Sequence, residues 1–237
     1  MLRFFRKMRN ALIPESRFGR YFFYALGEIV LVVIGILIAL QINNWNEKRK
    51  EAIFERKVLN EILTSLDQNI SYLDMGMEWN NQAINSCRII LNHFDNNISY
   101  TDSLDHHFST SLLWFYPSIN NNAYESLKSY GLHLIKNDTI REMLGSIYEW
   151  KYIEILNTRQ DEYFYGTISP ILTDLFESYE FRGSMKPYNY DELKKSKKYK
   201  HILRTMISNR DLQNLRWQQS KNNRLELAEM IKKELKK

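Results

Sequence analysis

Histidines are the residues of this sequence best suited to bind a metal ion, yet their spacing does not form a metal site. There are five, namely His93, His106, His107, His133 and His201. None belongs to the H-E-x-x-H motif of zinc proteases or to the Glu-x-x-His pair of di-iron helical bundles. The adjacent His106 and His107 would point to different faces of a helix. The sequence therefore predicts no metal site.

Catalytic and cofactor-binding patterns are also missing from the sequence. Four carboxylates lie within one predicted helix, but their spacings of 5, 7 and 1 residues do not place them on one face: Glu149, Glu154, Asp161 and Glu162. The chain has neither a G-x-S-x-G nucleophile turn nor a glycine-rich phosphate loop. Its single cysteine, Cys87, cannot found a zinc cluster or an intramolecular disulfide, and we expect it in the core. We predict a protein that is not an enzyme, with no catalytic residues and no cofactor.

Aromatic residues are dense between positions 114 and 165 and allow two interpretations. The candidates for a shared small-molecule pocket are Trp114, Tyr116, Trp150 and Tyr163. Such rings can line a ligand site between helices. Helical proteins also bury tyrosine and tryptophan routinely, with the polar tips at the edge of the core. Both interpretations stay open at this stage.

An apolar stretch, Phe22 to Ile42, determines where such a chain would reside. Twenty-one residues at about 1.5 Å each span about 31 Å, close to the hydrocarbon thickness of a bilayer. Only Glu28 and Gln41 are strongly polar, and Trp45 follows at the position of an interfacial aromatic residue. The stretch is too long for a signal peptide. It predicts one transmembrane helix, residues 18–45, with the lipid bilayer as its surroundings.

One face of the predicted transmembrane helix is suited to pack against another helix. Its residues follow one another by three and four positions: Ala25, Glu28, Val32, Gly35, Ala39 and Ile42. Small residues let backbones approach closely, and a carboxyl group costs less against a partner helix than against lipid. The face predicts a homo-oligomer. Two roles remain open for Glu28. It could take part in ion or proton transfer, or it could simply bond to Tyr24, to a lipid headgroup or to a neighbouring protomer.

The residues from Tyr24 to Lys50, YALGEIVLVVIGILIALQINNWNEKRK, resemble the N-terminal signature of an uncharacterised family of bacterial single-pass membrane proteins common in Bacteroidetes. The Gly27-Glu28 pair and the exit Gln41-Ile42-Asn43-Asn44-Trp45-Asn46 carry the likeness. This resemblance implies a membrane protein with a helical extramembrane part. It implies no activity and no functional residues.

Positive charge near the predicted span gives its orientation. Residues 1–17 form a basic amphipathic segment typical of a helix lying in the headgroup layer. Six Lys or Arg precede the span within twenty residues, and five follow it within fifteen. Because a short basic tail translocates poorly whereas long domains cross regardless of charge, we expect a cytoplasmic N-terminus. The C-terminal domain would then be periplasmic or extracytoplasmic, with the anchor in the inner membrane.

The segment after Trp45 predicts a long helix, residues 46–95. An apolar stripe recurs at alternating spacings of four and three from Leu59 to Phe94, interrupted by Asn80. A parallel coiled coil and the first helix of an intrachain bundle both fit. Phe54, Ile62 and Ile90 widen the stripe beyond a two-position seam, which favours the bundle. The predicted fold is all-α: a single transmembrane helix continuing into the long helix of a bundle over 46–237, with shorter helices over 102–181 and basic helices over 190–237.

Charge is segregated along the chain, whose net charge is +5. Residues 46–185 hold twelve basic and twenty acidic residues, whereas residues 186–237 hold fifteen basic and six acidic ones. A basic helix packing on an acidic bundle explains this better than a free nucleic-acid surface would. We expect no nucleic-acid partner. The function predicted is that of an oligomerising envelope scaffold with an unidentified protein partner. The alternative is a sensory module that binds a small ligand and signals through the continuous helix.

Overall fold

The computed structural model describes residues 17–149, 160–180 and 182–236, and every named element in these ranges is a helix. The chain divides into two compact units, Met1–Glu55 and Arg56–Lys237. Helix α2 runs without interruption from Arg17 to Asp95 and so contributes to both. This confirms the predicted all-α fold and the continuation of the apolar helix into a bundle. The predicted domain limits near residues 17 and 45 stay predictions.

In the first unit, the described helix is apolar and buries none of its side chains. Its most apolar part has a mean hydropathy of 2.6, which makes α2 long and apolar enough to cross a membrane. Large side chains along it are half exposed or more, among them Leu31 at 73% and Ile36 at 62%. A helix that is apolar all round needs an apolar environment, such as a protein core or a bilayer. Among the residues that the structure describes, none buries the apolar side chains between Leu26 and Ile42.

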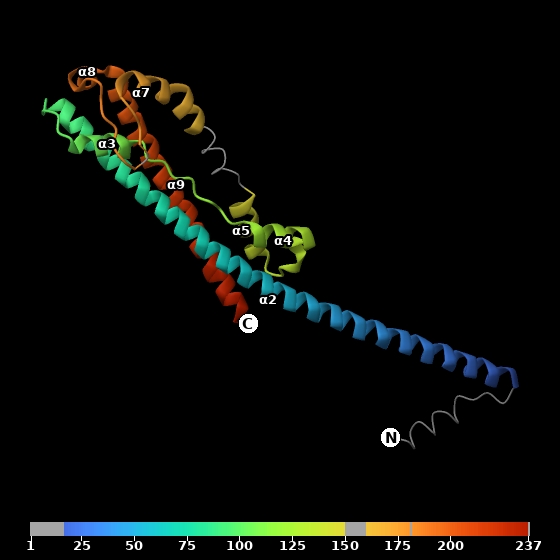
Figure 1. Cartoon of the computed structure of the whole chain (residues 1–237). Coiled ribbons are helices and arrows are strands. Elements are labelled where there is room, and N and C mark those ends of the chain that lie inside the picture. The colour runs from blue at the N-terminus through green and yellow to red at the C-terminus, as the bar shows by residue number, and fades with distance from the viewer. Residues whose placement is uncertain (1–16, 150–159, 181, 237) are drawn as a thin grey trace. The chain divides into compact units, whose positions relative to one another are not determined.

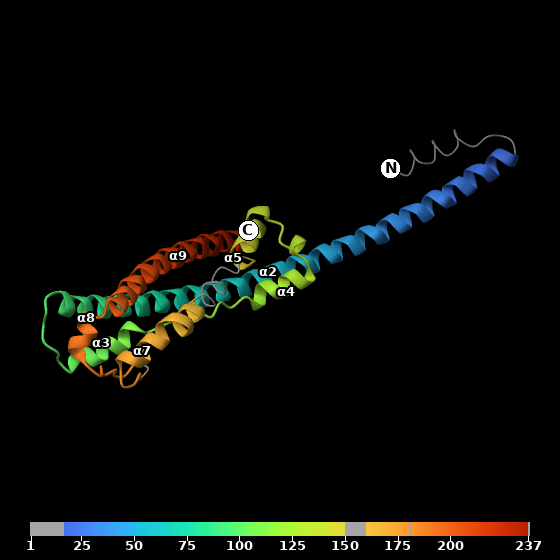
Figure 2. The same cartoon turned by 90° about the horizontal axis from the view of Figure 1, so that it is seen from above.

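The second unit is built around the later part of α2 and the C-terminal helix α9, Lys197–Leu235. These two helices lie side by side in both views of the chain (Figures 1 and 2). Hydrogen bonds join them at positions that rise along α2 as they fall along α9, so the helices are antiparallel. The bonded pairs are Arg56 with Leu235, Asp74 with Lys221, Asn80 with Gln213, and Asp95 with Lys200.

The apolar stripe of α2 packs within its own chain. Leu59, Leu66 and Leu73 are at most 1% exposed, and so are Ile62 and Ile90, which widen the stripe. The bundle is therefore the correct alternative in this structure, since a coiled-coil seam would leave these residues open to a second chain. Helix α2 ends at Asp95, where Asn97 takes a positive φ of 52° and reverses the chain.

Short helices cover the α2–α9 pair. They are α3 (Ser103–Ser111), α4 (Asn122–Tyr130), η1 (Leu132–Leu134), α5 (Asp138–Tyr148), η2 (Phe164–Ile168), α7 (Ser169–Leu175) and α8 (Tyr190–Lys195). An apolar cluster lies near the Asp95 end of α2. Residues of α2, α3, α7 and α9 contribute to it. In it the ring of Phe176 lies 5.2 Å from that of Phe108 and 5.4 Å from that of Tyr199. The segment from Leu113 to Asn121 is not helical and runs from α3 to α4.

Close packing in the middle of the bundle depends on Gly76 of α2. A Cβ atom on this residue would lie 2.6 Å from Cζ3 of Trp217 and 2.9 Å from Cδ1 of Phe115. Two rings from different parts of the chain therefore approach the α2 backbone at a point where any side chain would collide with them.

Candidate functional site

The predicted basic C-terminal helix packs on the acidic part of the chain as expected. Asp74 of α2 forms an ion pair with Lys221 of α9 at 2.6 Å, and Asp95 forms one with Lys200 at 3.2 Å. Each of these pairs is partly exposed, so each stabilises the packing only slightly.

Helix α9 also has a buried stripe that sequence inspection missed. Its positions alternate by four and three residues: Tyr199, Leu203, Met206, Arg210, Gln213, Trp217, Ser220, Arg224, Leu227 and Ile231. All but Ser220 are buried. The regular spacing was available in the sequence, but the prediction that this helix packs on the acidic bundle rested on its charge alone and did not identify the stripe. Because Arg210 and Arg224 fall on the stripe, two guanidinium groups enter the interior.

Arg210 is the most unusual residue of this interior. Its side chain is 0% exposed. Nη2 donates a hydrogen bond of 2.8 Å to the carbonyl oxygen of Leu113, and the guanidinium carbon lies 5.3 Å from the ring centre of Trp114. Nε and Nη1 have no hydrogen-bond partner among the residues that the structure describes. Burial lowers the pKa of Arg210, because the charged form loses its hydration.

A network of side-chain amides lies about one helical turn along α9 from Arg210. The amide nitrogen of Asn80 donates to Gln213 Oε1 and to Asn214 Oδ1, each at 2.9 Å. Gln213 in turn donates to Gln160 Oε1 at 3.5 Å. This amide network joins α2 to α9.

Cys87 lies in the same region and is buried, as predicted. Burial raises the pKa of its thiol to about 11, although the nearby Arg210 acts in the opposite direction. The thiol is therefore neutral at physiological pH and cannot serve as the counter-ion of the arginine.

Arg224 has a more local arrangement. Its Nη1 donates to the carbonyl oxygen of Ser220 at 3.2 Å and to the hydroxyl of the same residue. Its Nε has no partner in the described part of the chain. Fourteen residues of helix separate it from Arg210, a distance of about 21 Å, so the two guanidinium groups occupy separate sites.

The predicted aromatic set is only partly brought together. The rings of Trp114 and Tyr116 lie 6.5 Å apart, and the Tyr116 hydroxyl donates a hydrogen bond to Asp161. Tyr163 packs instead against the apolar cluster near α3 and α7. Trp150 lies outside the described residues. A different aromatic hollow opens beside η2 and α7, with Phe164, Phe176 and Tyr188 among its lining residues.

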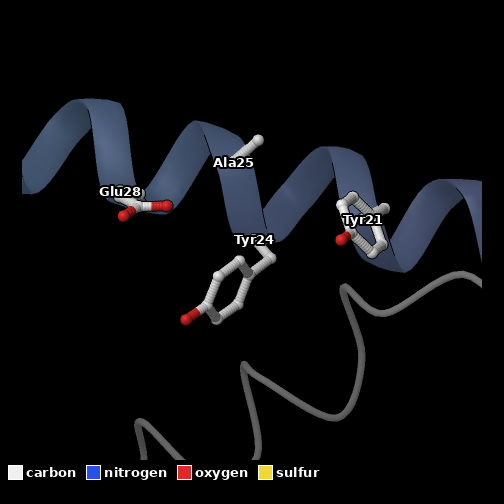
Figure 3. Close-up of a pocket in the computed structure, with 4 residues that line it drawn as sticks. All are labelled: Tyr21, Tyr24, Ala25 and Glu28. Atoms are coloured by element: carbon white, nitrogen blue, oxygen red, sulfur yellow. The ribbon is translucent and has the colours of Figure 1, made fainter.

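The predicted transmembrane packing face lies on the first unit, and the whole face is exposed: Ala25, Glu28, Val32, Gly35, Ala39 and Ile42. Glu28 lines a shallow hollow with Tyr21, Tyr24 and Ala25 (Figure 3). Tyr24 and Glu28 are one turn apart and project from the same side of α2, as Figure 3 shows. A Cβ atom at Gly35 would meet nothing within 4 Å, so the chain by itself does not require a glycine there.

No cluster of three or more His, Cys, Asp or Glu residues suited to a metal ion occurs in the ranges that the structure describes. The sequence pattern of DUF6090, a family of unknown function, matches residues 28–159. This match covers more than half of the chain and includes most of the apolar part of α2. No curated protein and no solved structure matches the chain.

Proposed function

The chain belongs to the DUF6090 family, whose function is unknown, and we propose that it is a membrane-anchored helical protein that self-associates through one face of α2. The observation that carries the proposal is the exposed apolar stretch from Phe22 to Ile42. Within this stretch even large side chains are well exposed, with Ile29 at 60% and Ile42 at 62%. Exposure of so many apolar side chains to water costs several kcal/mol, at roughly 25 cal/mol per Å². A bilayer removes this cost.

A second copy of the same helix is the partner proposed for the anchor. Glu28 sits among apolar neighbours, where a carboxyl group is costly unless another protein group receives it. Gly35 and Ala39 lie on the same face and let a second backbone approach. The helical unit Arg56–Lys237 would then be presented as an oligomer to a protein partner in the cell envelope.

The proposed orientation places the N-terminus in the cytoplasm and the bundle outside it, in the bacterial inner membrane. The six Lys and Arg residues that precede the span support it. A phosphatase reporter that requires export, fused after Lys237, should be active, and a cytoplasmic reporter fused there should be inactive. The reverse pattern would exclude this orientation.

Self-association is tested by changing the proposed face without disturbing the monomer. Gly35→Leu adds a bulky side chain on the face, whereas Gly27→Leu adds the same side chain roughly 110° from its centre. Neither glycine has another group within 4 Å of a built Cβ atom. In mild detergent, sedimentation should show an oligomer for wild type and Gly27→Leu and a smaller species for Gly35→Leu. Equal sedimentation of all three proteins would refute self-association through this face.

A ligand-binding sensory module is the second candidate, and the buried, partly unpaired Arg210 favours it. In that role the bundle would bind a small molecule, and α2 would transmit the change to a separate partner. Thermal stabilisation of the full chain by a ligand would support the sensor, whereas an oligomer insensitive to any ligand would support the scaffold.

A further inference from the structure

The interior around Arg210 contains more hydrogen-bond donors than acceptors. Buried nitrogen atoms without a partner in the described residues include Nε and Nη1 of Arg210 and the indole Nε1 of Trp114. All three can only donate. Buried donors are normally satisfied, and each one left unpaired destabilises the folded protein. The missing groups are therefore acceptors.

The positive charge of Arg210 also indicates that an acceptor is missing. A guanidinium group stays protonated in proteins, so Arg210 brings a positive charge into a site with 0% exposure. No Asp or Glu of the described chain forms an ion pair with it. An isolated buried charge is strongly destabilising, and a counter-ion within contact distance offsets that cost.

The surroundings limit what such a counter-ion can be. The Trp114 ring covers the guanidinium group at 5.3 Å, and the Leu113 carbonyl takes one of its donors. A single positive charge matches a single negative one. A carboxylate is planar, carries one charge and accepts paired hydrogen bonds from a guanidinium group. A phosphate dianion would leave an excess negative charge in the interior.

We infer that Arg210 and Trp114 form an internal site for a small monocarboxylate, with the guanidinium group as its counter-ion and the indole N–H as a further donor. Arg210 also holds the first residue of the non-helical segment Leu113–Asn121 through the Leu113 carbonyl. Binding would therefore fasten this segment to α9.

This inference names a ligand class for the sensory alternative and does not depend on the anchoring proposal. All of its residues belong to the unit Arg56–Lys237, whereas the self-association face belongs to the unit Met1–Glu55. Loss of acetate binding would leave the sedimentation of the oligomer unchanged, and loss of the oligomer would leave acetate binding unchanged.

Acetate is the probe, added to the full-length protein in detergent at pH 7 in a chloride-free buffer. At about a hundred times its dissociation constant, it should raise the thermal midpoint of the wild type by roughly 5–10 °C. Chloride at the same ionic strength should have a smaller effect. Arg210→Met should abolish the acetate response. Arg204→Met is the matched control, because it removes an arginine of the same helix whose side chain is 61% exposed, and it should respond like the wild type.

A direct measurement covers the case in which Arg210→Met fails to fold. In protein labelled with ¹⁵N at tryptophan, the indole signal of Trp114 should move downfield as acetate is added, because its N–H gains an acceptor. Trp114→Phe identifies that signal by its disappearance and should weaken the acetate response several-fold. Movement of all five tryptophan signals alike would mean a general solvent effect and would overturn the inference.

Two further outcomes would also overturn it. An equal response to chloride and acetate would mean that the site does not select a carboxylate. A wild type whose thermal midpoint does not respond to acetate would mean that the site around Arg210 binds no carboxylate.

Discussion

Replacing Gly76 by alanine tests how closely the bundle is packed, because two opposing effects can be compared there. Within a helix, alanine is more favourable than glycine by about 1 kcal/mol. Against this, the new Cβ atom would lie 2.6 Å from Trp217 and 2.9 Å from Phe115, well inside ordinary contact distance. Trp217 is only 1% exposed and cannot swing into solvent.

Overpacking a rigid core costs about 1–3 kcal/mol. Because two rings collide with the same atom, we expect a cost near the upper end of that range for Gly76→Ala. After the gain in helix propensity, the free energy of unfolding should fall by about 1–2 kcal/mol. For a unit of this size the thermal midpoint should fall by roughly 2–8 °C. Circular dichroism at 222 nm, recorded during heating in detergent, measures the change.

Gly145→Ala is the matched control. Gly145 lies within α5, and a Cβ atom there would meet nothing within 4 Å. The helix propensity acts alone at this position, so the variant should be more stable than wild type by up to about 1 kcal/mol. A second check is Trp217→Phe, whose smaller ring should make Gly76→Ala less costly by about 1 kcal/mol. If Gly76→Ala stabilised the protein as Gly145→Ala does, the close packing at α2 would be refuted.

Three other measurements follow from single contacts. Asn69→Ala removes the hydrogen bonds of 3.0 Å and 2.7 Å that fasten the backbone of Asn120 to α2. Urea titration should therefore show a free energy of unfolding lower by about 1–3 kcal/mol. An unchanged free energy of unfolding would mean that Asn69 does not hold this segment. Burial raises the pKa of the Cys87 thiol to about 11. At pH 8 this thiol should therefore react with a disulfide reagent at least a hundredfold more slowly than a free thiol, and denaturant should remove the difference. Fast labelling of the native protein would contradict the burial of Cys87. Desolvation, together with neighbouring histidines, lowers the pKa of His107 in the folded state. The unfolded chain therefore takes up the proton first as the pH falls below about 6.5, and the thermal midpoint should drop there. His107→Asn should reduce that drop while the exposed His201→Asn should not, and equal pH profiles for the two variants would exclude His107 as its source.

Helix α2 could be predicted closely because the information that defines it is local. The long helix was predicted to end at residue 95, and the structure ends it at Asp95. The width of the stripe, visible in Ile62 and Ile90, favoured a bundle over a coiled coil, and both residues are buried. Periodicity and turn chemistry determine these features without knowledge of distant contacts.

The interior around Arg210 could not be predicted in the same way. Residue type places arginine on the surface, and only the seven-residue spacing from Leu203 through Arg210 to Trp217 suggests otherwise. Its contacts with Leu113 and Trp114 join residues almost a hundred positions apart, which no local pattern encodes. The aromatic set failed to single out this site for the same reason: it identified Trp114 but not the cation beneath its ring.

The pairing of α2 with α9 also determines how the bundle must fold. Its hydrogen bonds close loops of 105 to 179 residues, whereas helical bundles with short connections form mostly local contacts. Folding rates fall as the mean sequence separation of contacts rises, so this unit should fold slowly for an all-helical protein. Before α9 packs on α2 during folding, the apolar stripe of α2 is exposed. Its regular spacing is suited to pairing with the same stripe on another molecule. The coiled coil that the native structure does not use is thus the misassembly that a slowly folding chain must avoid.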